Sequence, residues 1–376
     1  MKVDEPSRTI AYVSSAGTRE IFIFNLDCRT GALEPLTSVL VPGPDGPSPT
    51  SMPMALCPER EYLFAALRSG SFPISSFSVN PATGHLTLVS TVPLVDNVAY
   101  IATDRSGRFL LAASYEGSKL SVNGIHGGLV QMPALQVIPN IPRAHCIVAD
   151  LTNRWVFATS LEADLIIQME FDSGSGALVS RNVMRTKANA GPRHLALHPS
   201  GRFIYALNEL DASLIGFAFD SETGGLDQRQ CISMFPTNNR LSLSAADIHI
   251  TSDGRFLYAS ERVTHTIAGF AVESDTGRLT HLGLFPTEAS PRAFAISPCG
   301  HFLLAAGEIS HRVATYTIDG STGCLTKLAE RTVGANPNWI EMMPLPGTYT
   351  TAPPAYQSKS KDPRRITQCR SCSPGS

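Results

Sequence analysis

The chain repeats a unit of 46–53 residues, and this repeat limits its fold more than any single motif does. The clearest copies are LHPSGRFIYALNE from Leu197, ITSDGRFLYASER from Ile250 and ISPCGHFLLAAGE from Ile296. Each copy, including three fainter ones, carries one aromatic residue, the anchor, at the same place: Tyr62, Phe109, Trp155, Phe203, Phe256 and Phe302. Short β-branched and aromatic runs between Gly, Pro and Asp turns are typical of strands. A repeat of this period with several strands per unit predicts a β-propeller.

A second signature, T-G-x-L or a degenerate form of it, occurs seven times, although only six anchors are found. It lies around Gly31, Gly84, Gly127, Gly176, Gly224, Gly277 and Gly323. The seventh unit is accounted for if it is split, because residues 336–340 resemble a first strand and residues 8–13 resemble the strand that follows it. Pairing the two ends would leave no free sheet edge there. The sequence therefore predicts an all-β, seven-bladed β-propeller with four antiparallel strands per blade, closed by pairing of the N- and C-terminal strands.

The chain divides by composition into a long repetitive part and a tail. We expect the propeller domain over residues 1–346 and a disordered, basic, Ser/Pro-rich tail over residues 347–376. The tail holds five Lys/Arg against one Asp, a net charge of +4, and few apolar residues, so it offers little to bury. One C-x-x-C at Cys369–Cys372 is too little to predict a metal site.

Charge and hydropathy exclude several classes of partner. A formal net charge of −2 gives no electrostatic reason to expect nucleic acid or an anionic membrane. No apolar run is long enough to span a bilayer, and the start of the sequence lacks a signal-peptide core. Most cysteines are scattered through the predicted strands as small hydrophobic residues. We expect a cytoplasmic protein, either a monomer or a weak homo-oligomer.

Charged residues recur at two positions of the repeat that should meet at one face of the disc. The first two strands of a blade form an antiparallel hairpin, so the start of the first and the end of the second lie together near the axis. Ten residues before the anchors stand Met52, Ala99, His145, Arg193, Ala246 and Arg292. Six residues after them stand Arg68, Tyr115, Leu161, Glu209, Arg262 and Glu308. These two rows predict a pocket of opposed charges, the alternative being solvated loop ends with incidental ion pairs.

The residues of the rows have both a chemical and a structural interpretation. His145 titrates near neutral pH and suits a general acid or base, although a histidine at a strand start is also often structural. The arginines would clamp a phosphate or carboxylate and stabilise an oxyanion, or else they pair with Glu209 and Glu308. An arginine neighbour would lower the pKa of Glu209 and weaken it as a base.

Asp247 and His249 form a second constellation, because residues two apart in a strand share a face. A carboxylate that orients an imidazole is a catalytic sub-unit and equally a common buried hydrogen bond. His194 and Cys146 each follow a row residue and, in a regular strand, point the other way, which disfavours Cys146 as a nucleophile activated by His145. G-x-S-x-G, P-loop, G-x-G-x-x-G and H-E-x-x-H motifs are missing, so we expect a site without a metal ion.

The strings that carry these residues resemble the seven-bladed lactonase family. They are GPRHLALHPSGRFIYALNEL, AADIHITSDGRFLYASER and FPTEASPRAFAISPCGHFLLAAGE. The family includes bacterial 6-phosphogluconolactonases and fungal carboxy-cis,cis-muconate cyclases, and the resemblance covers residues 8–344. It implies hydrolysis of 6-phospho-D-glucono-1,5-lactone to 6-phosphogluconate in the pentose phosphate pathway, without a cofactor. By motif, the family's active-site residues fall on His145, Arg193, Glu209 and Arg262.

A lactonase acting on a small anionic lactone is thus the leading hypothesis. Water would attack the carbonyl with His145 or Glu209 as base, while Arg193 and Arg262 stabilise the oxyanion. Four further residues are expected to bind substrate: Arg292, Glu308, Asp247 and His249. A muconate cyclase would use the same pocket for proton transfer to carbon. A non-catalytic propeller scaffold is the third possibility, but it would need no Arg/His/Glu pocket on the axis.

Overall fold

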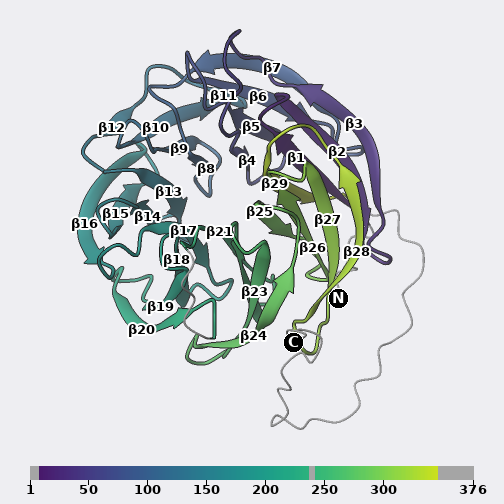
Figure 1. Cartoon of the computed structure of the whole chain (residues 1–376). Helices are drawn as coiled ribbons and strands as arrows, with labels where there is room; N and C mark the ends of the chain where they lie inside the picture. The colour runs from purple at the N-terminus through teal and green to yellow at the C-terminus, as the bar shows by residue number, and fades with distance from the viewer. Residues whose placement is uncertain (1–7, 237–241, 346–376) are drawn as a thin grey trace, which may run out of the picture.

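Seven small antiparallel sheets surround a central axis in the computed structural model, which describes residues 8–236 and 242–345 (Figure 1). Within these ranges there are 29 strands and no helix, and hence no helix that could cross a membrane. The sheets radiate like blades, with one strand of each nearest the axis and the last strand at the rim. The prediction of a disordered tail over residues 347–376 lies outside the described residues.

The strands of each blade follow one another from the axis outward. Blade 1 consists of β29 (Pro337–Pro344), β1 (Arg8–Ser15), β2 (Glu20–Asp27) and β3 (Leu33–Leu40). Blade 2 consists of β4 (Met54–Leu56), β5 (Tyr62–Ala66), β6 (Pro73–Val79) and β7 (Leu86–Pro93). Blade 3 consists of β8 (Tyr100–Thr103), β9 (Phe109–Ser114), β10 (Lys119–His126), β11 (Leu129–Val130) and β12 (Gln136–Ile138). Blade 4 consists of β13 (Ala144–Ala149), β14 (Trp155–Ser160), β15 (Leu165–Asp172) and β16 (Ala177–Arg185).

The remaining three blades have the same order. Blade 5 consists of β17 (Pro192–Leu197), β18 (Phe203–Asn208), β19 (Ser213–Phe219) and β20 (Leu226–Ser233). Blade 6 consists of β21 (Ala245–Ile250), β22 (Phe256–Glu261), β23 (Thr266–Val272) and β24 (Leu279–Pro286). Blade 7 consists of β25 (Pro291–Ile296), β26 (Phe302–Gly307), β27 (Arg312–Ile318) and β28 (Leu325–Thr332).

The ring closes through blade 1, as the sequence predicts. Its innermost strand, β29, comes from the end of the chain and pairs antiparallel with β1 from the start, with Thr9 opposite Pro344 and Val13 opposite Ile340. Blade 3 departs from the predicted four strands, because its outer strand is split into β11 and β12. Pro133 stands between the two pieces and has no N–H to donate to the ladder, which accounts for the break.

The anchors and the T-G-x-L turns turn out to be two halves of one contact between neighbouring blades. Phe109 of blade 3 covers Gly176 of blade 4, and a Cβ on that glycine would lie 2.5 Å from the ring. Gly176 also has φ +81°, a conformation that favours glycine. Across the ring junction Phe302 covers Gly31 in the same way. At the seventh position the role falls to Ile10, which covers Gly84, so only six aromatic anchors can be found in the sequence.

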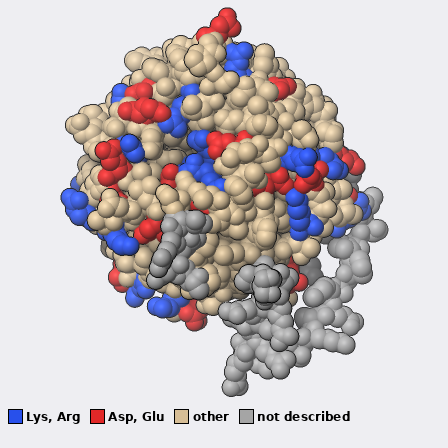
Figure 2. Space-filling view, viewed as in Figure 1, with Lys and Arg blue, Asp and Glu red and all other residues tan. Residues whose placement is uncertain are grey.

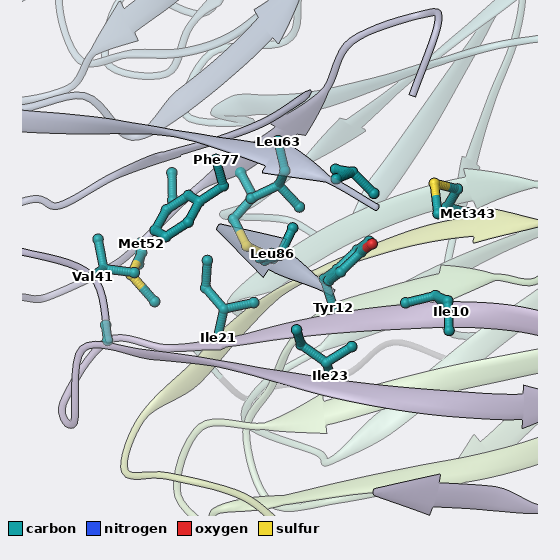
Figure 3. Close-up of a cluster of buried hydrophobic side chains, with 14 of the residues drawn as sticks. Ile10, Tyr12, Ile21, Ile23, Val41, Met52, Leu63, Phe77, Leu86 and Met343 are labelled. Carbon is teal, nitrogen blue, oxygen red and sulfur yellow. The ribbon is translucent and has the colours of Figure 1, made fainter. Parts of the chain in front are cut away.

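Apolar clusters between adjacent blades form the core. Between blades 1 and 2, Ile10, Tyr12 and Phe77 are almost fully buried and pack with residues of both blades (Figure 3). Each large side chain of this kind contributes about 1.5–3 kcal/mol through removal from water. The Tyr12 hydroxyl donates to the Gly84 carbonyl at 2.7 Å, so its one polar atom is also satisfied. Packing from blade to blade fixes the inner strands, and these strands position the site.

Candidate active site

Four consecutive inner strands begin with a β-bulge, and the bulges place the charged row residues. Register shifts separate Ala144 from Cys146, Pro192 from His194, Ala245 from Ile248, and Pro291 from Ala293. A bulge leaves a residue unpaired and re-aims its side chain. The shifts fall on three charged row residues, His145 in β13, Arg193 in β17 and Arg292 in β25. In β21 the shift spans the row residue Ala246 and its neighbour Asp247.

Because these strands are not regular, the prediction that His194 points away from Arg193 is wrong. The Nη1 atom of Arg193 lies 3.2 Å from Nε2 of His194. Cys146, in contrast, packs among apolar side chains of blades 4 and 5, and burial raises the pKa of its thiol to about 12. A thiol that stays protonated at neutral pH is a poor nucleophile. This agrees with the sequence analysis, which disfavours Cys146 as a nucleophile.

Arg193 and Arg262 are held by the carboxylate between them. Glu209, just after β18, pairs with Nε of Arg193 at 2.8 Å and with Nη2 of Arg262 at 2.8 Å. Arg193 is 3% exposed, so this charge is almost wholly removed from water. Burial would raise the pKa of Glu209, but the two guanidinium charges more than offset it, and the pKa is lowered. Glu209 therefore stays ionised and serves better as the partner of two arginines than as a base.

The same pattern recurs two blades further on. Nη1 of Arg292 pairs with Glu308 at 2.8 Å, and the Ser290 hydroxyl donates to the other carboxylate oxygen at 3.2 Å. Arg68, in turn, pairs with Glu116 through Nε at 3.0 Å. Figure 2 shows basic and acidic side chains, blue and red, next to one another near the centre of the face turned to the viewer. The structure thus brings the charged residues of the two predicted rows together as paired arginines and glutamates, which we call the Arg/Glu cluster.

His145 lies beside the Arg/Glu cluster as a neutral imidazole. It is 5% exposed and contacts the rings of Tyr115 and His194 edge-on, at centroid distances of 5.7 and 5.1 Å. Burial, then the charge of Arg193, lowers the pKa of His145 well below the usual value of 6.5. Its Nδ1 atom is buried and has no hydrogen-bond partner among the described residues. A neutral imidazole keeps one ring nitrogen with a free lone pair, which can accept a proton.

Asp247 connects three inner strands. Its Oδ1 accepts from Nδ1 of His194 at 2.9 Å, and its Oδ2 accepts from Nε2 of His249 at 3.1 Å and from the backbone N–H of Phe294 at 3.2 Å. Burial would lower the pKa of His249, but the Asp247 carboxylate outweighs it and raises that pKa. The predicted Asp247–His249 pair therefore exists, while His194 is a second imidazole on the same carboxylate that the sequence argument did not include.

His249 belongs to a cavity of about 380 Å³ on the axis, together with Asp247, His194 and Glu341. Its lining also includes Leu197, Ile250, Ile296 and Met342. Since these lie at or near the far ends of the inner strands, the cavity extends away from the strand starts that carry His145, Arg193 and Arg292. Burial raises the pKa of Glu341 to about 7, and the indole N–H of Trp339 donates to it at 2.9 Å. No sequence signal singled out Glu341, because it stands in the split seventh unit, which has no anchor to index it.

The chemistry of the Arg/Glu cluster suits a reaction that develops negative charge on oxygen. The guanidinium groups of Arg193, which is buried, and Arg262, which is half-buried, offer N–H donors beside Glu209, and such donors stabilise an oxyanion. A neutral imidazole beside them can take a proton from water. Arg292 and Arg68 add further positive charge, to which an anionic substituent of a substrate can bind.

Comparisons with known proteins place this arrangement in context. The family model "Lactonase, 7-bladed beta-propeller" matches residues 8–342. A 6-phosphogluconolactonase from Pectobacterium carotovorum subsp. carotovorum (strain PC1) is 36% identical over 338 residues, which cover 89% of this chain and 99% of that protein. A 6-phosphogluconolactonase from Serratia proteamaculans (strain 568) is 35% identical over 77% of this chain and 85% of that protein. The solved structure of a periplasmic gluconolactonase from Pseudomonas aeruginosa superposes with a TM-score of 0.81 at 25% identity, covering 90% of this chain and all of that one.

Proposed function

The chain belongs to the lactonase family of seven-bladed β-propellers, and we propose that it hydrolyses 6-phospho-D-glucono-1,5-lactone to 6-phosphogluconate. The observation that carries this proposal is the match, over nearly their whole length, to relatives named 6-phosphogluconolactonase. The Arg/Glu cluster and His145 at the axis supply the groups that such a reaction needs. The enzyme is thus a carboxylic ester hydrolase of carbohydrate metabolism.

In the proposed reaction, His145 accepts a proton from water as the water oxygen bonds to the lactone carbonyl carbon. The carbonyl oxygen becomes an oxyanion, which the guanidinium groups of Arg193 and Arg262 stabilise by hydrogen bonds. The bond from carbon to the ring oxygen then breaks, and the protonated imidazole returns its proton to the departing alkoxide. Glu209 takes no part in the proton transfer, because its two arginine partners hold it ionised and lower its basicity.

The phosphate group is proposed to bind at Arg292, with Arg68 close by. Both side chains are largely buried yet reach the mouth of the site, with 16% and 11% of the side chain exposed. A phosphate oxygen can accept the N–H groups that Glu308 and Glu116 do not use, since a guanidinium group carries five donors. Glu308 then contributes to substrate binding indirectly, because its ion pair holds the Arg292 side chain in place.

The test is a comparison of lactones as substrates for the purified protein. 6-Phosphogluconolactone is generated in the cuvette, its hydrolysis is followed through 6-phosphogluconate dehydrogenase, and the spontaneous rate is subtracted. Glucono-1,5-lactone and a muconolactone are measured in parallel by pH-stat. The proposal predicts the highest kcat/KM for the phosphorylated lactone. A preference for glucono-1,5-lactone would reject the phosphate assignment, and activity on the muconolactone alone would reject the sugar-lactone function.

A further inference from the structure

A chain of hydrogen bonds connects Arg193 through His194 to the carboxylate of Asp247. Nη1 of Arg193 donates to the backbone carbonyl of Ala246 and lies 3.2 Å from Nε2 of His194. Nδ1 of the same imidazole lies 2.9 Å from Oδ1 of Asp247. The side chains of Arg193, His194 and Asp247 are buried, with residue exposures of 3%, 5% and 7%. No step of the hydrolysis described above uses His194 or Asp247.

The two contacts of His194 determine which ring nitrogen carries the proton. An ionised Asp247 is an acceptor only, so Nδ1 of His194 must be the donor. Arginine is a donor only, so Nε2 of His194 must present its lone pair to Nη1. Burial, followed by the charge of Arg193, lowers the pKa of His194 to about 4, which keeps the ring neutral near pH 7. The imidazole therefore holds the Nδ1–H tautomer and accepts from the guanidinium group.

The consequence is a guanidinium group whose Nη1 atom is fixed by both of its N–H groups. The two N–H bonds of Nη1 point to Ala246 and His194. Nε lies 2.8 Å from a carboxylate oxygen of Glu209, an ion pair without a hydrogen bond. Nη2 makes no hydrogen bond to any residue in the described part of the chain. Since Nε is buried against Glu209, the Nη2 edge is the part of Arg193 that can face a ligand. An oxyanion donor must be held in position before the reaction, because a displacement of about 1 Å can cost about a hundredfold in rate.

We propose that Asp247 and His194 are positioning residues that orient Arg193 so that its Nη2 edge faces the lactone oxyanion. The proposal rests on the lactonase function argued above and adds two residues to it that do not touch the substrate. Asp247 sets the tautomer of His194, and His194 sets the rotation of the guanidinium group. The bulge at Arg193 makes this possible, because it turns two successive side chains toward the axis.

A purely structural role is the alternative, since Asp247 also ties β17 to β21 and β25. Two substitutions of His194 separate the roles. In His194→Gln, the amide oxygen reaches the place of Nε2 and can still accept from Arg193, but the link to Asp247 is lost. In His194→Asn, the shorter amide reaches Asp247 in place of Nδ1–H, but nothing accepts from Arg193. Positioning predicts that Gln preserves activity better than Asn, whereas a structural role predicts the reverse.

The experiment measures kcat and KM for 6-phosphogluconolactone in the two variants. His194→Asn should lower kcat by about a hundredfold, as expected for a misplaced donor, with little change in KM. His194→Gln should retain at least about ten times the kcat of the Asn variant, a difference of about 1.4 kcal/mol in transition-state stabilisation. In an Arg193→Ala background the two substitutions should no longer differ. His198→Asn, just beyond the other end of β17, is the matched control and should keep the wild-type rate. Equal kcat values for the two His194 variants, or a higher value for Asn, would overturn the proposal.

A second readout does not depend on activity. Two-dimensional 15N–1H spectra of 15N-histidine-labelled protein report which ring nitrogen of His194 carries the proton, with His194→Gln used for assignment. We expect the Nδ1–H tautomer at neutral pH. Finding the Nε2–H tautomer would overturn the proposal whatever the enzyme acts on. If the wild-type protein fails to hydrolyse the lactone, the proposed function falls, and the tautomer still decides whether His194 accepts from Arg193.

Discussion

Replacement of Glu209 by Gln tests the ion pairs on which the site is built. The carboxylate balances Arg193 and Arg262 at 2.8 Å each. A glutamine side chain at this position would offer one oxygen to one arginine and point an amide N–H group at the other. Breaking a buried ion pair costs about 3–5 kcal/mol, and because the side chain of Glu209 is 17% exposed we expect the lower end, about 3 kcal/mol. An unfolding entropy of about 2.1 cal/mol/K per residue over roughly 340 residues converts this into a fall of about 4 °C in Tm.

The same variant makes a prediction about pH. The pKa of Glu209 is lowered in the folded protein, so its contribution to stability is complete above the unfolded value of 4.5 and is lost as pH falls through the folded pKa. The difference in Tm between wild type and Glu209→Gln should therefore be constant around neutral pH and shrink once the pH falls below the unfolded value. Scanning calorimetry measures both quantities. The control is Glu330→Gln, whose ion pairs with Arg312 and Lys327 are exposed to solvent and should contribute little to Tm. A variant as stable as wild type at neutral pH would refute the account of the arginine pair.

Single contacts determine the expected effects of substitutions at Gly176, His145 and Arg292. Gly176→Ala should lower the free energy of unfolding, measured by chemical denaturation, by about 1–3 kcal/mol. The φ of +81° disfavours a side chain, and the Phe109 ring occupies the place of Cβ. Gly320→Ala is the control and should cost less, because no atom lies within 4 Å of the place of its Cβ. The acid limb of the pH profile of kcat/KM should lie below pH 6.5, because His145, a base with a lowered pKa, is protonated only as pH falls through that pKa. The variant His145→Gln should lose this limb and most of the rate. Quenched assays at each pH measure both. Arg292→Ala should raise KM for the phosphorylated lactone more than for glucono-1,5-lactone, and an equal rise in both would place the phosphate elsewhere.

The architecture could be predicted from the sequence because each blade repeats the same contact. The anchors and the turn glycines are two halves of this contact, and both leave a clear residue signature. The seventh anchor position escaped detection because Ile10 takes the place of the aromatic ring. The break in the outer strand of blade 3 was missed because the apolar pattern continues on both sides of Pro133. The period of a repeat therefore predicts the ring better than it predicts individual strands.

The positions of the site residues could be predicted from the sequence, but not all of their side-chain orientations, because the inner strands contain bulges. Indexing on the anchors gave the positions of His145, Arg193 and Glu209, since these follow the repeat. The orientation of the next side chain does not follow from strand periodicity once a bulge intervenes, so a regular strand puts His194 on the wrong side. The spacing of Asp247 and His249 along one strand predicts their pair. The contact of Asp247 with His194 joins two blades, so no sequence spacing predicts it.

The central claim is that the Arg/Glu cluster at the starts of the inner strands, and not the axial cavity beyond it, hydrolyses the lactone. The most direct test compares Arg193→Ala with Glu341→Gln, a variant in the axial cavity that can keep the hydrogen bond from Trp339. Hydrolysis of freshly generated 6-phosphogluconolactone is measured through 6-phosphogluconate dehydrogenase. Arg193→Ala should lose at least about 10²-fold in kcat, the cost of one oxyanion donor, while Glu341→Gln should keep the wild-type rate. A loss in Glu341→Gln with Arg193→Ala still active would contradict the central claim and move the reaction into the cavity.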